Sequence, residues 1–202
     1  MTTATATLAN TCAQNLSAGN YTIPDNDISV WVGNLDAYNN GELAGEWLAL
    51  PASEEEINAM LTRIGCMKDG ELVYEYLVMD YDDNTGMGLA SWLGEYGNLG
   101  ELSELAQAWE DCGDQEKLAE IAPAELSWHA SGQDFIDLAE NLDDYVYIEA
   151  ATDYDLGWYY AHELGMLSEY PEELLNYFDY EAYGRDISFD LTATKNGYYY
   201  AG

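Results

Sequence analysis

The residues of this chain that could do chemistry are mainly carboxylates, since its 202 residues include 39 Asp and Glu but only five Lys and Arg. Two histidines are present, His129 and His162, and neither has a second His or a Cys at the spacing of a zinc site. The sequence also lacks a Gly-rich phosphate-binding loop with Lys, a GxSxG elbow, a paired Cys motif and an HExxH motif. No familiar catalytic constellation can be recognised.

The stretch Asp80–Asn84 begins like the calcium-binding loop of an EF-hand, with oxygen donors at alternate positions. Thr85 stands where that loop needs a glycine for its sharp turn, and Ser91 stands where it needs a bidentate glutamate. Carboxylate pairs like those of a glycosidase arise by chance among so many acids, and the sequence singles out none. We therefore expect a protein that is not an enzyme and that has no metal site and no cofactor.

The net charge of −34 at pH 7 belongs to a chain that is 48% hydrophobic and contains 18 Tyr and six Trp. Acidic disordered chains have few aromatic residues, so this composition indicates a folded protein. The few cations are scattered, which excludes direct binding to nucleic acid, and the negative charge repels an anionic membrane. No apolar run approaches the ~18 residues of a membrane-spanning helix.

The uncharged segment Met1–Pro24 has neither a basic start nor a continuous apolar stretch, so it does not resemble a secretory signal. Cys12, Cys66 and Cys112 are odd in number and far apart, which favours reduced thiols over a disulfide framework. We expect a cytoplasmic protein.

Turn signals and hydrophobic periodicity predict an α+β chain with an N-terminal extension, 1–27, that is loosely ordered, and three small domains. In the αβ domain 28–82 we expect strands at 28–32 and 75–81, and a helix that Ser53 caps together with Glu56 and that Gly65 ends. The domain 83–145 is expected to be helical.

The last domain, 146–202, is predicted to be αβ and to follow a strand at 145–149. We expect a helix around 158–164, a helix from Pro171 toward Tyr183, and strands at 187–191 and 197–200.

Two apolar stripes at helical spacing mark the middle domain, and acids lie between them. The first stripe contains Leu102, Leu105 and Trp109, and the second contains Phe135 and Leu138. The candidate functional residues are the acids of these helices and of their neighbours: Glu54, Glu55, Glu101, Glu104, Glu110, Asp111, Asp114, Glu116, Glu120, Asp134, Asp137, Glu140, Asp143, Asp144, Asp153 and Asp155.

Three explanations for the negative charge compete: life in high salt, a binding module for a basic partner, and imitation of DNA phosphates. Duplex DNA carries one charge per ~1.7 Å of axis, so 34 charges correspond to ~58 Å of duplex. A compact globule of this length is only ~43 Å across. Imitation of DNA therefore favours domains arranged as an elongated chain.

The string from Ile28 to Pro51, ISVWVGNLDAYNNGELAGEWLALP, closely resembles the N-terminal motif of the ArdA antirestriction proteins. Further matches are the segments 54–65, 76–82 and 177–186. The resemblance implies a bacterial protein of plasmids or conjugative elements that mimics bent B-form DNA. Such a protein inhibits type I restriction–modification enzymes by occupying the DNA site of their methyltransferase core.

The resemblance also implies three small domains, no catalytic residues and a homodimer formed through the last domain. Tyr177, Phe178, Tyr180 and Tyr183 could supply the dimer contact, although aromatic residues at helical spacing are more often core. The alternative function is an acidic module that inhibits another basic or DNA-binding protein, such as a nuclease or a repressor.

Overall fold

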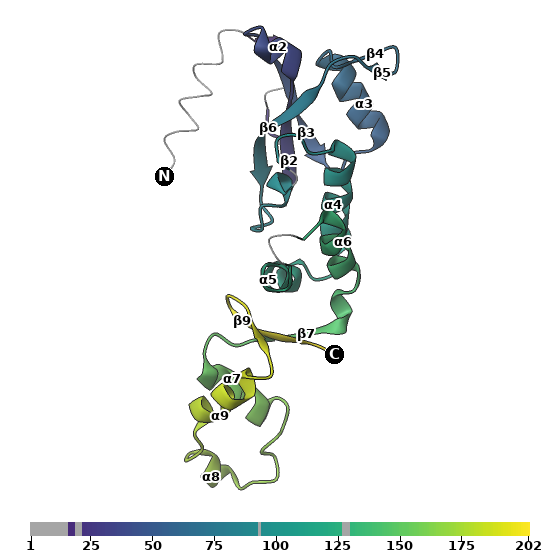
Figure 1. Ribbon diagram of the computed structural model, residues 1–202. Helices are drawn as coiled ribbons and strands as arrows, with labels where there is room; N and C mark the ends of the chain where they lie inside the picture. The colour runs from purple at the N-terminus through teal and green to yellow at the C-terminus, as the bar shows by residue number, and fades with distance from the viewer. Residues whose placement is uncertain (1–15, 19–21, 93, 127–129) are drawn as a thin grey trace. The chain divides into compact units, whose positions relative to one another are not determined.

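The computed structural model describes residues 16–18, 22–92, 94–126 and 130–202, and these divide into two compact units, one up to Asp111 and one from Cys112 onward (Figure 1). Each unit combines helices with strands, and the strands are concentrated toward the two ends of the chain. The predicted α+β class with a helical middle is confirmed. The division into three domains stays a prediction.

The first unit is built on a four-stranded sheet with the strand order β1-β3-β2-β6. The central strand β2 is antiparallel to both neighbours, and its Trp31 lies opposite Trp47 on one side and Asp80 on the other. All residues of β2 are buried, which places the core of the unit along this strand. The strands span Leu16–Ala18 (β1), Ile28–Asn34 (β2), Leu43–Leu50 (β3) and Tyr76–Asp83 (β6).

Strand β1 pairs in parallel with β3, although the sequence assigned its three residues to a loosely ordered extension. Residues 1–15 and 19–21, with Cys12, lie outside the described residues. The expectation for the rest of the extension is therefore untested.

Helix α3 begins with the capping box that the sequence predicted. The Ser53 hydroxyl accepts a hydrogen bond from the Glu56 amide (3.3 Å), and the Glu56 carboxylate accepts one from the Ser53 amide (2.8 Å). Met60 and Leu61 are buried, and Gly65 follows the helix with a positive φ of 79°. The helix spans Glu54–Arg63 and lies beside the sheet, next to the hairpin of β4 (Met67–Lys68) and β5 (Glu71–Leu72) (Figure 1).

The remaining elements of the first unit are α2 (Leu35–Asn39), the 3-10 helix η1 (Leu89–Ser91) and α4 (Leu99–Asp111). The predicted apolar stripe of α4 is buried, and the indole of its Trp109 donates a hydrogen bond to Asp27 (3.2 Å).

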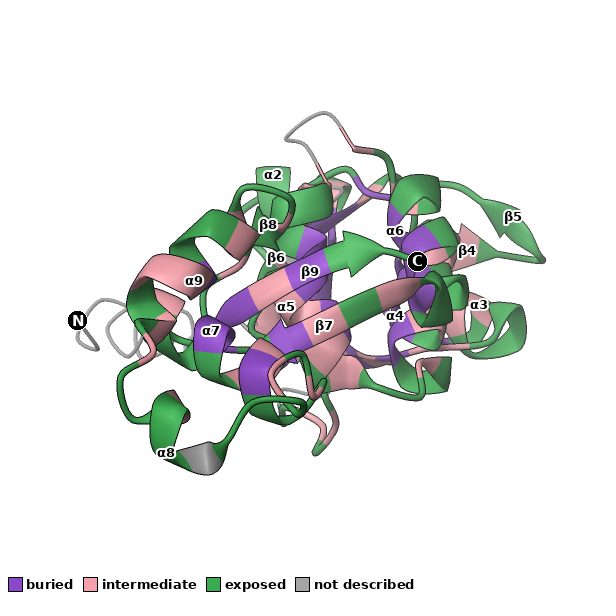
Figure 2. Ribbon diagram, turned by 90° about the horizontal axis from the view of Figure 1, so that it is seen from below, coloured by how far each residue is buried: buried purple, intermediate pink, exposed green. Residues whose placement is uncertain are grey.

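The second unit contains a three-stranded sheet with the order β7-β9-β8, whose core contains Ile148, Ala150 and Leu156. Helices α7 and α9 pack against each other, whereas α8 and the loop before it are largely exposed (Figure 2). The elements span Gln115–Glu125 (α5), Gly132–Glu140 (α6), Leu142–Asp144 (η2), Tyr145–Glu149 (β7), Asp153–His162 (α7), Glu172–Leu175 (α8), Tyr180–Ser188 (α9), Thr192–Ala193 (β8) and Gly197–Ala201 (β9).

Two predictions for the last part of the chain are wrong in detail. The predicted strand at 187–191 is instead the end of α9 and the turn after it, because α9 continues to Ser188. The predicted helix from Pro171 toward Tyr183 is interrupted, and α9 starts afresh where the Asp179 carboxylate accepts a hydrogen bond from the Ala182 amide (3.0 Å). No helix of the described residues is long and apolar enough to cross a membrane.

Candidate functional site

The candidate site is the acidic surface, which we define as the sixteen carboxylates named above. All but two of them are exposed, and the exceptions, Glu120 and Asp153, are half-buried. Both units contribute to this surface, and each contribution is described on its own.

In the first unit, α4 buries one face in the core and presents acids on the other. Leu102 and Leu105 are each 2% exposed, while Glu101 and Glu104 beside them are exposed. Helical residues three or four positions apart have Cβ atoms ~5–6 Å apart, so these two carboxylates are neighbours. Four acids of this surface come from α4, namely Glu101, Glu104, Glu110 and Asp111.

In the second unit, α6 carries the most regular row of acids. Asp134, Asp137 and Glu140 recur every three residues and are exposed, whereas Phe135 and Leu138 between them are buried. The row continues into η2 with two more exposed acids, Asp143 and Asp144. Like charges at this spacing destabilise a helix by a few tenths of a kcal/mol per pair, so the row costs stability.

Several acids of this surface also hold local structure together. Ser131 donates a hydrogen bond from its hydroxyl to Asp134 (2.7 Å) and one from its amide (2.7 Å), which lowers the pKa of that carboxyl. Asp114 accepts a hydrogen bond from the Lys117 amide (3.0 Å), and Thr152 donates one to Asp155 (2.7 Å).

Glu120 joins α5 to the turn between β8 and β9. It accepts hydrogen bonds from the Thr194 hydroxyl (2.9 Å) and from the Asn196 amide (3.0 Å). Burial alone would raise the pKa of Glu120, but these hydrogen bonds and the nearby charge of Lys195 together lower it. Neutralising Glu120 therefore affects folding as well as surface charge.

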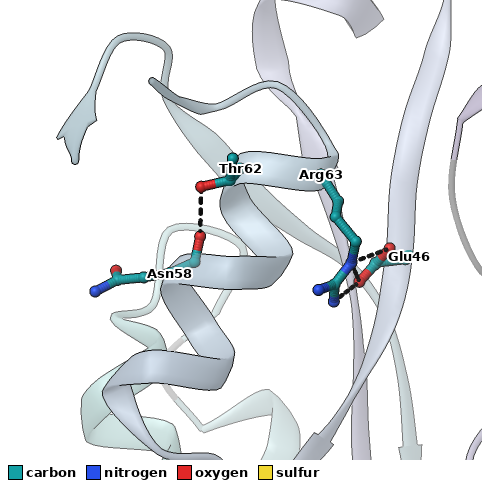
Figure 3. Close-up of polar contacts among 4 residues, drawn as sticks. All are labelled: Glu46, Asn58, Thr62 and Arg63. Atoms are coloured by element: carbon teal, nitrogen blue, oxygen red, sulfur yellow. Dashed lines mark hydrogen bonds and ion pairs between the residues drawn. The ribbon is translucent and has the colours of Figure 1, made fainter. Parts of the chain in front are cut away.

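Three of the five cations of the chain have partners within the fold. Arg63 of α3 reaches the buried Glu46 of β3, with its Nε 2.9 Å from one carboxylate oxygen and 3.3 Å from the other (Figure 3). Lys117 donates to the Leu142 carbonyl (2.8 Å), and Arg185 pairs with Asp186 (3.3 Å). Within the described residues, the carboxylates of the acidic surface form no ion pair.

The aromatic residues proposed for a dimer contact separate into two kinds. Phe178, Tyr180 and Tyr183 are half-buried, and the Phe178 ring centroid lies 5.2 Å from each of the other two. Tyr177 instead is 88% exposed. Among these four residues only Tyr177 presents a large exposed surface, and the dimer contact stays a prediction.

The two histidines offer no metal site in the part of the chain that the structure describes. His129 lies outside it. His162 shares a hydrogen bond with the Tyr180 hydroxyl (2.9 Å) and stacks on Trp158. Across the described residues, no group of three or more His, Cys, Asp or Glu side chains is arranged to hold a metal ion.

Sequence reasoning missed the buried carboxylate of Glu46 and the role of Glu125, which accepts a hydrogen bond from the Tyr199 hydroxyl (2.6 Å). For Glu46 a local signal exists, since it lies in an apolar run between Gly45 and Trp47. For Glu125 none does, because its donor is 74 residues away.

Comparison with known proteins finds a family that matches most of this chain. The family model described as antirestriction protein (ArdA) matches residues 30–200. A search for curated relatives finds no match. The family match confirms the resemblance to the ArdA antirestriction proteins that the sequence indicated.

Proposed function

Because the chain belongs to the ArdA family of antirestriction proteins, we propose that it inhibits type I restriction–modification enzymes by occupying their DNA-binding groove. In this proposal the acidic surface takes the place of the phosphates of B-form DNA, and the methyltransferase core of the enzyme is the partner. The proposal places the protein in the cytoplasm of a bacterium and its gene on a plasmid or conjugative element.

The observation that carries this proposal is the row of acids on α6 and η2. Three exposed carboxylates recur every three residues on α6, and two more follow in η2. No cation pairs with any of the five within the described residues. Repulsion between these carboxylates destabilises the folded protein. A basic protein surface of the kind that binds DNA phosphates would neutralise their charge. In the first unit, α4 likewise presents exposed acids that form no ion pair within the described residues.

A displacement assay tests the proposal. Purified methyltransferase core, holding a fluorescent duplex with its recognition sequence, is titrated with the protein at several salt concentrations. We expect the duplex to be released, with an apparent affinity that falls as salt rises. Retention of the duplex at all protein concentrations contradicts the proposal, and equal inhibition of an unrelated nuclease or repressor favours the alternative of a general acidic module.

We further propose that the protein forms a homodimer through the segment that includes α8. Its described residues expose large apolar side chains: Met166 (60%), Tyr170 (59%), Leu174 (55%) and Tyr177 (88%). Concentrations of exposed apolar surface often mark protein interfaces. Three small domains in an elongated arrangement complete the proposal, and a maximum dimension near ~43 Å per protomer in small-angle scattering would count against that arrangement.

A further inference from the structure

The second unit contains an open groove of about 1170 Å³, lined by residues of α5, β7 and α7. The groove combines two kinds of side chain. One kind is aromatic and the other is acidic.

The aromatic side is formed by Tyr154 and Trp158, which are one turn apart on α7 and are 49% and 41% exposed. Contacts with neighbouring rings restrict the motion of both side chains. The Trp158 indole stacks on the His162 ring, with centroids 4.7 Å apart, and the Tyr154 and Tyr180 rings pack edge to face, with centroids 5.5 Å apart. Exposed aromatic faces held in this way are ready to stack with a planar cation.

The acidic side includes Glu116 of α5 and Glu149 of β7, which line the same groove and are exposed. Their carboxylates accept no hydrogen bond and form no ion pair within the described residues. Lys117 is the cation that lines the groove, and its ammonium group donates to the Leu142 carbonyl (2.8 Å). The groove is therefore negative as well as aromatic.

We propose that this groove binds an arginine side chain of the partner protein. The guanidinium stacks on the exposed aromatic rings and pairs with Glu116 or Glu149. Arginine fits better than lysine because its planar, weakly hydrated guanidinium can stack and make paired hydrogen bonds at once. The identity of the partner rests on the proposed function, since a DNA-binding surface is rich in Arg and Lys.

Two blocked peptides of equal charge test the groove directly, Gly-Arg-Arg-Gly and Gly-Lys-Lys-Gly, each titrated into the full chain by calorimetry at low salt. We expect the arginine peptide to bind about two- to five-fold more tightly than the lysine peptide. Trp158→Leu should remove this preference. The double variant Glu116→Gln/Glu149→Gln should weaken both peptides.

Matched variants outside the groove serve as controls. Tyr38→Leu removes an aromatic ring of similar exposure (52%) from the first unit, and Glu140→Gln/Asp143→Asn removes the same charge. Both should keep the preference for arginine. If Trp158→Leu does not fold, as judged by circular dichroism, Tyr154→Leu provides the same test from the neighbouring ring.

Equal binding of the two peptides overturns the inference, as does a preference that survives loss of the aromatic ring or disappears equally in the controls. These outcomes do not depend on inhibition of a restriction enzyme. If the wild-type protein displaces DNA but shows no preference for arginine, the inference about the groove is refuted and the proposed function is not. A protein that prefers arginine but displaces no DNA refutes the proposed function alone.

Discussion

Gly157 of α7 and Gly184 of α9 lie backbone to backbone where the two helices pack. A Cβ atom on Gly157 would lie 2.9 Å from the Gly184 amide nitrogen and would overlap the Tyr180 carbonyl, and one on Gly184 would overlap the Asp153 carbonyl. Only glycine allows this approach, so the spacing of α7 and α9 depends on both residues.

We therefore expect Gly157→Ala to lower the free energy of unfolding by about 1–3 kcal/mol, because the added methyl group forces the helices apart. Gly113→Ala is the matched control, since a Cβ there meets nothing within 4 Å. Urea unfolding followed by circular dichroism measures both. Equal stability of the two variants would contradict the close packing of α7 and α9.

The sequence predicted well those features that local signals determine. Ser53 and Glu56 form their capping box because both members lie within one helical turn. The alternating pattern of 187–191, in contrast, favoured a strand. In the structure these residues end α9 and form the turn after it. Gly184 of α9 packs against Gly157, and no local sequence pattern indicates a packing partner 27 positions away.

For the candidate site, the sequence predicted which helix faces carry acids, because burial of an apolar stripe leaves the other face exposed. The sequence did not predict which of these acids also accept hydrogen bonds from other parts of the fold. Glu120 contacts Asn196, and Asp153 accepts a hydrogen bond from the Tyr198 hydroxyl (3.1 Å), so both depend on residues distant in the sequence.

A second prediction concerns the ion pair of Glu46 and Arg63. The Glu46 side chain is 8% exposed and that of Arg63 is 58% exposed, so loss of the guanidinium leaves a buried carboxylate without its partner. Arg63→Met should lower the free energy of unfolding by about 1–3 kcal/mol. Lys68→Met is the control, because it removes an exposed positive charge. The double variant Glu46→Gln/Arg63→Met should recover part of the lost stability. A double variant no more stable than Arg63→Met would argue against an unpaired carboxylate as the cause.

Tyr199 should make the protein sensitive to alkaline pH. Burial raises the pKa of Tyr199 to about 12, and its hydrogen bond to Glu125 adds to the shift. An unfolded tyrosine has a pKa of ~10, so the stabilisation from Tyr199 is complete below that pH. It is lost as the pH rises from about 10 to about 12, because the unfolded chain then releases its proton first.

The measurement for Tyr199 is urea unfolding at pH 8 and pH 11. At pH 8, Tyr199→Phe should be less stable than the wild type by about 1–3 kcal/mol, and at pH 11 the difference should shrink. Tyr38→Phe changes an exposed tyrosine and should leave the pH dependence as it is. A difference that stays constant across this range would mean that Tyr199 does not titrate as described.

The proposed dimer leads to a fourth prediction. Tyr177→Asp places a charge on the most exposed of the apolar side chains near α8, and it should weaken dimerisation at least ~10-fold in sedimentation equilibrium. Tyr96→Asp is the control, because Tyr96 is also largely exposed (76%) but belongs to the first unit. Equal effects of the two variants, or none from Tyr177→Asp, would place the dimer contact elsewhere.

The last prediction concerns how inhibition is distributed over the acidic surface. If the acids replace phosphates, binding is the sum of many exposed contacts, each worth ~0–1 kcal/mol. The single variants Glu104→Gln, Asp111→Asn, Asp137→Asn and Asp144→Asn should therefore each weaken inhibition of a type I enzyme by a few-fold at most. All four residues are exposed.

Glu120→Gln belongs in the same series as a contrast. The Glu120 carboxylate accepts hydrogen bonds from Thr194 and Asn196. Replacing it should therefore lower the stability of the second unit in addition to any effect on inhibition. Comparing urea unfolding with inhibition separates these effects. The four exposed variants should lose no stability, and those in the row on α6 and η2 should gain slightly because each removes a repelling charge.

Combining the exposed variants gives the decisive measurement. Losses from well-separated sites should add in free energy, and the dependence of inhibition on salt should become shallower with each charge removed. A catalytic centre behaves in the opposite way, because one substitution removes most of the activity and further ones add little. One exposed substitution that abolishes inhibition in a protein that still folds and dimerises would therefore indicate a focused site in place of a distributed imitation of DNA.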